Sequence, residues 1–582
     1  MLIGMFIHDR LFAMLNRIII APSERKKVSG IWRGIALTVI LALISGFAVS
    51  ARTEEELGKE IRDEMVGEFS DSMSKLVLST LKKLPGWLRV RKEANKLLNQ
   101  IPDFPEPVPV PDEEEIFSWI EGLASFSHRR PGSPEAMAAE DYLVRELEKT
   151  GITGIKKEPI ELNHWEAGNY SLAIETEEGY QPFPCFYVPY SGFTREEGVV
   201  AEMVYIGKGR PKDFAGREVR GKIVVAEVPF VNLPYGLLLK LLPSYYFSDP
   251  GKSIGLGFRL PLIFVRRNFL GYATEKVHLP TDVYWQSVDS GAAGIILILK
   301  DQPTNSNTHY GPYDGILKPL PGLWVGKYDG VQLRGYAKKG LKARLVLQGD
   351  VKESVSHNIY GFLPGQSERT IIIASHHDSP FQGAVEDGSG CAQVLAQARA
   401  WAKIPRERRP KTLLFLFTAG HFYASIGSST FAKTHKHDLL KKIDLVFVTE
   451  HIAAKEAREA ENRQYEFTGH LELGGIFTEN QGYVVASVIK MLKTHPLERV
   501  VSVPIDFFGT SPPTDVSGFV LEPDLDVPVL SWITGPAYLL CAEDTLDKIE
   551  VSQLDDFAGA TAGLVGSLMM LKSELIIGNN KR

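Results

Sequence analysis

The 582-residue chain has few cysteines and no strong excess of either charge. Its three cysteines, Cys185, Cys391 and Cys541, are far apart and odd in number, so they form neither a disulfide framework nor a cysteine-rich zinc site. The net charge of −6 is spread along the chain, which leaves no basic surface for nucleic acid. No internal repeat stands out, and the length predicts two globular units plus a tail.

One apolar run near the N-terminus is long enough to cross a bilayer. Gly34–Ala51 is an uncharged run of 18 residues. Basic residues precede it and three glutamates follow, so the positive-inside rule predicts a cytoplasmic segment 1–33 and an exported remainder. A cleaved signal peptide is the alternative, because Val49-Ser-Ala51 is an acceptable cleavage site; its basic part would be long unless translation starts at Met14. The sequence thus predicts a single-pass membrane protein, or a secreted one after cleavage.

Residues 52–113 are expected to connect this apolar run to the globular part of the chain. Charged and apolar residues alternate with helical spacing up to Gln100, which is typical of a helical stalk. The proline-rich segment Ile101–Asp112 predicts an extended spacer. Two amphipathic helices, broken at Pro131-Gly-Ser-Pro134, are then expected over Glu114–Thr150.

One stretch combines metal-binding side chains with a strand and a turn. The apolar run Ile371–Ser375 predicts a buried strand, and it ends in His376-His377-Asp378. The glycine-rich turn that follows carries Glu386 and Asp387 near the start of a predicted helix. Imidazole and carboxylate groups on neighbouring loops at this edge of a sheet are how proteins hold zinc or a similar divalent ion. Either half alone would favour a surface histidine pair or a capping turn, but together they favour a metal site.

A second set of motifs follows in a fixed order. A strand pattern runs from Arg409 to Gly420 and is followed by Gly427-Ser428. With the stretch above, these residues resemble the co-catalytic zinc aminopeptidase family, whose relatives include glutamate carboxypeptidase, the transferrin receptor ectodomain and glutaminyl cyclase. The resemblance implies an α/β fold with a mixed, mainly parallel sheet and helices on both faces, formed by residues 114–165 and 354–575.

The expected elements of this α/β part come from apolar runs and helical spacing. Strands are predicted at Asn358–Phe362, Thr370–Ser375, Thr412–Phe417, Ile443–Thr449 and Val527–Ile533; helices are predicted at Cys391–Lys403, Ser429–Thr434, Val484–Lys493 and Val551–Lys572. Residues 166–353 differ in character and resemble the β-rich protease-associated domain that is inserted in many members of this family. Inside them, the apolar segment 233–265 predicts a buried local cluster or, alternatively, a membrane or partner contact.

The resemblance also assigns roles to individual residues. The family binds two zinc ions about 3.5–4 Å apart, bridged by one carboxylate and a water. His376, Glu386 and Glu450 occupy the ligand positions of one ion, and both of the family's aspartates there have become glutamates. Asp378 matches the carboxylate that orients the metal-bound imidazole.

The second ion lacks ligands in this chain. Its carboxylate and imidazole positions align with Phe422 and Leu540, which cannot bind metal. The general-base position aligns with His421, which can take a proton from water or can itself be a ligand. One ion held by His376, Glu386 or Asp387, Glu450, and either His421 or His451 would satisfy tetrahedral coordination. A shifted alignment at Ala419–Gly427 is the remaining alternative.

These residues lead to a functional expectation with one alternative. We expect metal-dependent hydrolysis of a peptide or similar amide, with one zinc or other divalent ion and with His421 as the base. The alternative is an inactive relative that serves as a surface binding or scaffold protein. The expected partners are a peptide or small amide and, through the N-terminal helix, a membrane; the sequence leaves a homodimer open and does not identify the substrate.

Overall fold

The computed structural model describes residues 82–228, 231–233, 236, 239, 244–255, 260–262, 283–300, 302, 304–507, 514–515 and 517–578. By internal contacts the chain divides into two units, and the larger comprises residues 86–233, 243–255 and 259–582. The predicted cytoplasmic segment, the apolar run 34–51 and most of the predicted stalk lie outside the described residues. Within the described ranges, no helix is both long and apolar enough to cross a membrane.

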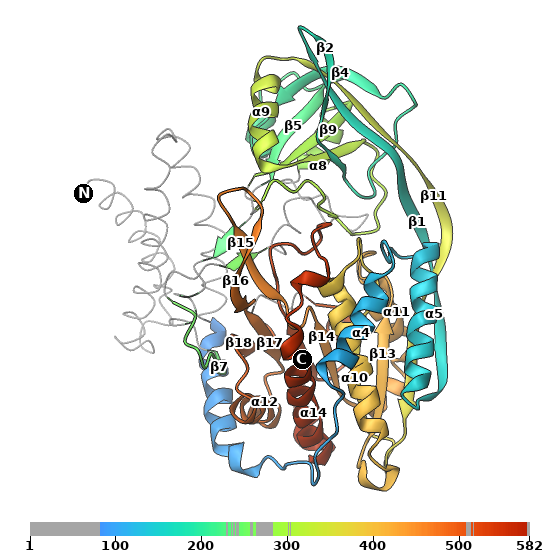
Figure 1. The fold of residues 1–582 in the computed structure, drawn as a ribbon, viewed down its shortest axis with the longest axis vertical. Coiled ribbons are helices and arrows are strands. Elements are labelled where there is room, and N and C mark those ends of the chain that lie inside the picture. The colour runs from blue at the N-terminus through green and yellow to red at the C-terminus, as the bar shows by residue number, and fades with distance from the viewer. Residues whose placement is uncertain are drawn as a thin grey trace, which may run out of the picture. The chain divides into compact units, whose positions relative to one another are not determined.

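The core of the larger unit is a mixed sheet. Its strands run in the order β11-β13-β12-β14-β19-β17-β18 (Figure 1). Their bounds are β11 (Lys342–Leu363), β12 (Thr370–His376), β13 (Thr412–Thr418), β14 (Ile443–Glu450), β17 (Gly474–Thr478), β18 (Val500–Pro504) and β19 (Val529–Ile533). The pairs β12–β13, β12–β14, β14–β19 and β17–β18 are parallel, while β11 and β17 join the central strands antiparallel. Every residue of β12 and of β14 is buried, so both faces of these strands are covered.

The expected strands and helices of this part are present, with shifted ends. The strand predicted at Thr370–Ser375 is β12, and the one predicted at Asn358–Phe362 is the end of the much longer β11. The strands β17 and β18 were not predicted; β17 is short and begins with two glycines. The four predicted helices correspond to α10 (Gly390–Ala402), α11 (Ile426–His435), α12 (Gly482–Thr494) and α14 (Leu554–Met570).

Two helices precede the sheet, and their ends follow from capping residues. In α4 (Glu113–Ala124), the Asp112 side chain accepts from the backbone N–H of Glu115, and three glutamates in the first turn complement the helix dipole. In α5 (Pro134–Lys149), the Ser133 hydroxyl caps the first turn and Pro134 occupies the position where a missing N–H costs nothing. The break between them lies where the Pro-Gly-Ser-Pro segment predicts it.

The predicted insert continues the same sheet. Strand β1 (Thr153–Thr176) pairs antiparallel with β11 along most of its length, and Glu166 faces Asp350 in this ladder, so the boundaries expected near 166 and 353 fall inside paired strands. Beyond them the sheet order is β4-β5-β9-β10-β3, with parallel pairing from β4 to β10. The elements are β2 (Gly179–Phe183), β3 (Phe186–Tyr187), β4 (Val199–Tyr205), β5 (Ile223–Val228), β9 (Gly294–Leu299), β10 (Gly322–Val325), α6 (Pro211–Phe214), α8 (Val283–Asp289) and α9 (Lys327–Lys338). The described part of the insert therefore contains helices as well as strands.

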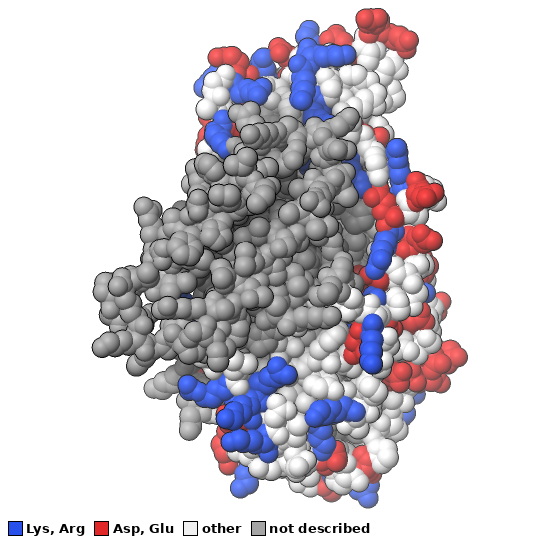
Figure 2. All heavy atoms as spheres, turned by 90° about the vertical axis from the view of Figure 1, so that its left-hand side faces the viewer, with Lys and Arg blue, Asp and Glu red and all other residues white. Residues whose placement is uncertain are grey.

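The remaining elements are short. They are the β6 (Val231–Leu233) and β8 (Leu260–Leu262) pair, the β15 (Lys455–Glu459) and β16 (Tyr465–Leu471) hairpin, the edge strand β7 (Tyr246–Ser248), α13 (Ser517–Leu521) and α15 (Ser573–Ile577). β7 pairs antiparallel with β18, so part of the apolar segment 233–265 extends the sheet. On the face shown in Figure 2, acidic and basic side chains both occur among the described atoms.

The described end of the predicted stalk and the spacer that follows it both contact the α/β region. Trp87 is buried and its indole N–H donates to Asp506 at 3.0 Å. The Lys490 ammonium of α12 donates to the Ile101 carbonyl at 2.7 Å and pairs with Asp103 at 2.7 Å. The apolar spacing that predicts a stalk therefore also serves, in this part, to pack the segment onto the α/β region.

Candidate metal centre

Two neighbouring strand ends and one turn bring the polar side chains together. His376 is the last residue of β12, and Glu450 is the last residue of the adjacent parallel strand β14. His451 follows with φ near 55°, a left-handed conformation that turns the chain away from the strand direction. Glu386 lies in the turn Ala384–Ser389, directly before α10. The carboxyl ends of parallel strands meet at one sheet edge, which is where ligands bind in open α/β sheets.

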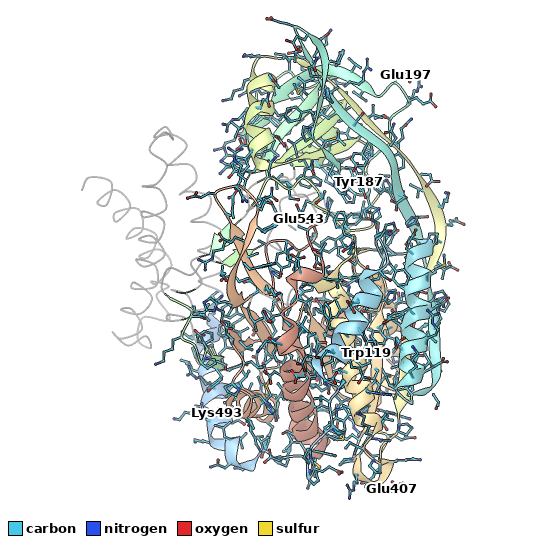
Figure 3. All side chains as sticks on the ribbon, in the orientation of Figure 1. Trp119, Tyr187, Glu197, Glu407, Lys493 and Glu543 are labelled. Atoms are coloured by element: carbon cyan, nitrogen blue, oxygen red, sulfur yellow. The ribbon has the colours of Figure 1, made fainter. Side chains whose placement is uncertain are left out.

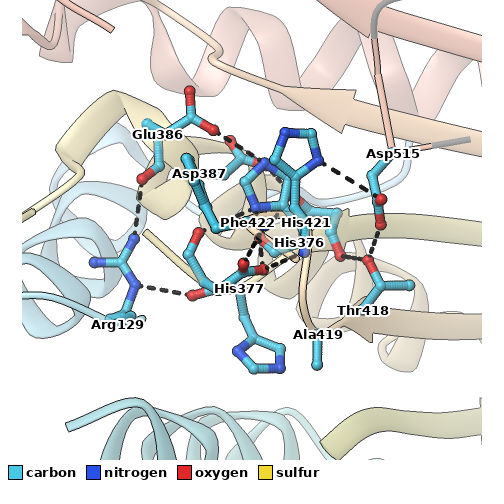
Figure 4. Close-up of polar contacts among 12 residues, drawn as sticks. Arg129, His376, His377, Glu386, Asp387, Thr418, Ala419, His421, Phe422 and Asp515 are labelled. Atoms are coloured by element: carbon cyan, nitrogen blue, oxygen red, sulfur yellow. Dashed lines mark hydrogen bonds and ion pairs between the residues drawn. The ribbon is translucent and has the colours of Figure 1, made fainter. Parts of the chain in front are cut away.

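His376, Glu386 and His451 form the centre of the site. His376 Nε2 lies 3.2 Å from Glu386 Oε1, and His451 Nε2 lies 2.9 Å from Glu386 Oε2. One donor atom from each residue lies within 4.8 Å of the other two, and all three residues are buried. Figure 4 shows His376 and Glu386 joined across this contact. Among the described residues, this is the single group of three or more His, Cys, Asp or Glu side chains with that geometry.

The second nitrogen of each imidazole determines the tautomer. His376 Nδ1 lies 3.1 Å from the Asp378 carbonyl, and His451 Nδ1 lies 2.9 Å from the Thr534 carbonyl. A carbonyl can only accept, so each Nδ1 carries a proton. Both Nε2 atoms therefore face Glu386 with a lone pair, unless each ring is also protonated there. Lone pairs facing a carboxylate repel, so a positive charge is required between these groups.

The ionisation of the three groups reflects the same requirement. Burial opposes charge on His376, but Asp378 and Glu386 outweigh it and raise the pKa of His376 well above its ordinary value. Burial likewise opposes charge on His451, and Glu386 raises its pKa to about 9. Burial alone would raise the pKa of Glu386, but His451 and His376 lower it well below its ordinary value. A proton on each imidazole or one divalent cation satisfies this arrangement.

The three residues fit a zinc ion. His376 Nε2, His451 Nε2 and Glu386 Oε1 are buried and make no hydrogen bond with the described residues. Two imidazoles and one glutamate form a ligand set that catalytic zinc sites use, with a fourth position left for water or substrate. The carbonyls that hold the Nδ1 protons supply the outer hydrogen bonds that orient metal-bound histidines.

Two residues hold the turn that carries Glu386. The Arg129 guanidinium donates to the carbonyls of His377, Gly383 and Glu386, among others, at 2.9, 3.1 and 3.3 Å. The Asp544 carboxylate accepts from the backbone N–H groups of Val385 and Glu386 at 2.9 and 2.8 Å. Asp544 thereby ties the loop that precedes Thr545 to the Glu386 turn. Arg129 lies between the two helices expected over Glu114–Thr150, and Figure 4 shows it beside the site.

Asp387 and Glu450 lie next to the centre, and both accept hydrogen bonds from backbone N–H groups. Asp387 accepts from the backbone N–H groups of His451 and Gly390 at 2.9 and 3.1 Å and from the Ser375 hydroxyl. Its peptide bond with Glu386 is cis. Glu450 Oε1 accepts from the backbone N–H of Asp515 at 2.7 Å, and burial raises the pKa of Glu450 to about 7. Asp387 Oδ2 also lies 4.0 Å from His376 Nε2. The donor atoms that all lie within 4.8 Å of one another are nevertheless those of His376, Glu386 and His451.

His421 lies over His376 with its ring parallel to it. The two ring centroids are 4.1 Å apart and the planes differ by 10°. A metal ion binds an imidazole in the ring plane, so two stacked rings cannot share one ion. His421 Nδ1 instead faces Asp515 Oδ1 at 3.6 Å (Figure 4). Asp378 accepts from the backbone N–H groups of His421 and Phe422 at 3.0 and 2.7 Å, while its carbonyl and carboxylate face His376.

The other side of the centre is apolar. Phe422 is fully buried and contacts the rings of Tyr310 and Tyr313 at centroid distances of 5.9 and 5.1 Å. Tyr313 also stacks on His421 at 5.4 Å, and Tyr310 N–H donates to the carbonyl of buried Leu540 at 2.8 Å. Both tyrosines lie in the predicted insert, residues 166–353, which therefore contacts Phe422 and His421 beside the candidate centre.

Hydrogen bonds join the predicted insert to the loop that contains Glu543. The Ser306 and Thr308 hydroxyls donate to Glu543 at 3.0 and 3.3 Å. Figure 3 labels Glu543 in this loop and Tyr187 in the insert. Tyr190 donates from its hydroxyl to the Phe422 carbonyl at 3.0 Å.

Part of the chain that contains the candidate metal centre is similar in sequence to known peptidases. Residues 358–495 match Peptidase family M28. Carboxypeptidase Q of Xenopus laevis is 25% identical over 326 residues, covering 55% of this chain and 61% of that protein. Carboxypeptidase Q of Homo sapiens is 22% identical over 315 residues, covering 53% of this chain and 58% of that protein. The chain thus spans less than two thirds of the length of these curated relatives.

Solved structures share the fold. The zinc aminopeptidase from Bacillus subtilis superposes with a TM-score of 0.57 at 16% identity, covering 81% of this chain and 99% of that chain. The Peptidase M28 precursor from Shewanella amazonensis superposes with a TM-score of 0.56 at 19% identity, covering 83% and 97%. The family match and the curated relatives add sequence evidence to this shared fold. The chain is a relative of the co-catalytic zinc exopeptidases of peptidase family M28.

Proposed function

We propose that this protein is a metal-dependent hydrolase that cleaves a peptide or similar amide bond and uses one zinc ion. The observation that carries the proposal is the convergence of His376, Glu386 and His451, with both imidazole Nδ1 atoms tied to carbonyls and both Nε2 atoms facing the carboxylate. The M28 match and the zinc aminopeptidase structures support zinc as the ion.

The residues around the centre supply the remaining chemistry. A zinc ion held there would polarise the scissile carbonyl and make water more acidic. His421 is the group we assign to accept the proton as the water oxygen bonds to the carbonyl carbon. That proton then passes to the amide nitrogen as the carbon–nitrogen bond breaks, which releases an amine and a carboxylate. Asp378 positions both His376 and His421 through the contacts described above.

Metal content tests the proposal directly. We expect about one zinc per purified full-length chain and none after His451→Ala, because the remaining two ligands hold the ion weakly. His470→Ala is the matched control, since that imidazole is exposed and pairs with Glu498 at 2.7 Å, away from the centre. Hydrolysis of aminoacyl and dipeptide substrates should follow the metal. Equal zinc in His451→Ala and wild type would contradict the assigned centre.

A second candidate function is a peptidase-like binding or scaffold protein without activity. The observation that favours it is the closed site: His376, Glu386 and His451 are each at most 2% exposed, and Tyr313 lies over His421. Zinc bound without hydrolysis of any peptide in a broad panel would support the scaffold. Hydrolysis that is lost together with zinc would exclude it.

We also propose that residues 34–51 anchor the protein in a membrane, with the α/β region outside the cytoplasm. The basic residues before this run and the glutamates after it support the orientation. Protease added to intact cells should degrade the α/β region of a tagged full-length chain. A protected, soluble product would exclude the anchor and the orientation, and release into the medium would favour the cleaved signal peptide.

A further inference from the structure

The position of the general base is occupied by an imidazole, and an imidazole needs a second group to determine which nitrogen is free. A carboxylate base needs no such control. A neutral imidazole has one protonated nitrogen and one that accepts, and its neighbours decide between them. The residue that faces His421 therefore decides whether this ring can act as a base.

Asp515 is the acidic side chain that the structure places against His421. Its Oδ1 lies 3.6 Å from His421 Nδ1, and both groups are buried. His421 Nδ1 makes no hydrogen bond with the described residues. The separation is that of an ion pair and exceeds a hydrogen bond, but hydrogen bonds of catalytic groups are often long before substrate binds.

Asp515 is held from three sides. The Thr418 hydroxyl at the end of β13 donates to Oδ2, and the Ser428 hydroxyl in α11 donates to Oδ1 at 3.2 Å. The backbone N–H of Asp515 donates to Glu450 Oε1 at 2.7 Å. The carboxylate is therefore fixed relative to β13, α11 and β14.

Two aromatic rings stack on His421. His376 stacks on one face at a centroid distance of 4.1 Å, and Tyr313 stacks at 5.4 Å. Its backbone N–H donates to Asp378. Stacking leaves the ring edge for polar contacts, and at that edge Nδ1 faces Asp515.

We propose that Asp515 is a positioning residue that keeps the proton of His421 on Nδ1 and leaves Nε2 free to accept a proton. Glu450 acts through Asp515, because its carboxylate anchors the Asp515 backbone. The inference rests on the proposed function of His421 as the base. It also assigns a role to Glu450, whose alignment position predicts a metal ligand.

The histidine tautomer in the full-length protein tests the inference independently of activity. We would label the chain with 15N-histidine and identify the His421 signals by their loss in His421→Gln. The wild type should show the Nδ1–H tautomer at His421. Asp515→Asn should shift it toward Nε2–H, because an amide N–H can donate to Nδ1. It should also lower kcat about 10²–10⁴-fold while KM and zinc content change little.

Asp444→Asn is the matched control. Asp444 is also a buried aspartate at the sheet, but it pairs with Arg369 and with Lys411, the latter at 2.7 Å, and does not contact His421. This variant should keep the wild-type tautomer. If Asp515→Asn does not fold, Glu450→Ala removes the anchor of the Asp515 backbone and should weaken the Nδ1–H preference.

The outcomes separate this inference from the proposed function. An Nε2–H tautomer in the wild type, or an unchanged tautomer in Asp515→Asn, would overturn the role of Asp515. The expected tautomers in a protein that hydrolyses nothing would uphold the positioning and overturn the hydrolase. Hydrolysis that survives Asp515→Asn with the tautomer unchanged would uphold the hydrolase and overturn the positioning.

Discussion

The two sides of the candidate centre differ in the chemistry that each can support. On one side, two imidazoles face a buried glutamate, and the pKa shifts of all three groups show that a positive charge is stabilised between them. On the other side, Phe422 and Leu540 are packed against tyrosines of the insert. An ion on that second side would have no protein ligand from these two residues. This contrast supports the proposal of a single ion, because the polar side offers three converging donor atoms and the other side offers buried apolar side chains.

The largest expected effect comes from removing the charge on the polar side. Glu386→Gln keeps the size of the side chain but removes the anion between His376 and His451. We expect zinc affinity to fall by more than about 100-fold, since even losses outside the ligand shell cost about 10–100-fold. Hydrolysis should fall with it. Metal titration of wild type, Glu386→Gln and the exposed control Glu466→Gln measures the difference in zinc affinity. Full zinc binding by Glu386→Gln would contradict the assignment of Glu386 as a ligand.

A large effect of another kind is expected on the apolar side. Phe422→Ala should destabilise the fold by about 3–5 kcal/mol, because it leaves a cavity among buried rings. Zinc content should remain near one per chain, since Phe422 is not a ligand. Denaturant unfolding and metal analysis of the same samples check both statements. Phe467→Ala, at a ring that is 41% exposed, is the control and should cost less than about 1 kcal/mol. Loss of zinc with Phe422→Ala alone would show that the two sides are not independent.

Glu472 is a buried carboxyl group without an imidazole partner, so its pKa can be compared with that of Glu386. Burial, together with Glu456, raises the pKa of Glu472 to about 7, whereas Glu386 beside two imidazoles has a lowered pKa. The folded state keeps this proton where the unfolded chain has lost it, so the free energy of unfolding decreases as the pH rises from about 4.5 to about 7.

Glu472→Gln removes that dependence. The variant should be more stable than wild type at pH 7.5, by at most about 3 kcal/mol, and the difference should shrink as the pH falls from about 7 to about 4.5. Its amide oxygen can still accept from the Leu473 N–H, as Glu472 does at 3.1 Å. Unfolding curves across this pH range provide the measurement. A variant that is less stable than wild type at pH 7.5 would show that Glu472 is ionised and paired in the folded state.

The smallest effect is expected at an exposed ion pair that lies away from the candidate metal centre. His470 Nδ1 lies 2.7 Å from Glu498, and their side chains are 43% and 29% exposed. Glu498→Gln should change the free energy of unfolding by less than about 1 kcal/mol, because solvent and salt screen exposed pairs. Zinc content and hydrolysis should not change. A change in zinc content would mean that the centre is coupled to this distant hairpin.

Much of the fold was predictable because its signals are local. The β-branched run before His376 predicts β12, and the Pro-Gly-Ser-Pro segment predicts the break before α5. His376, Glu386 and Asp378 follow a strand or a glycine-rich turn, so spacing alone places them at one sheet edge. Asp515 was missed because it lies in a loop where no hydrophobic period or motif marks its side chain. Its role depends on contacts with Thr418, Ser428 and Glu450 that are distant in sequence.

The sequence by itself predicted the class of fold and the resemblance to zinc exopeptidases, and it aligned Phe422 and Leu540 with the ligand positions of the second ion. The tertiary structure decided which of the two neighbours Glu450 and His451 faces Glu386. Successive residues of a strand point to opposite sides, and the left-handed backbone at His451 redirects its side chain beyond the end of β14. Composition and spacing cannot encode that direction. It depends on the backbone conformation after the strand and on the hydrogen-bond partners, which are the Thr534 carbonyl for His451 and the Asp515 backbone N–H for Glu450.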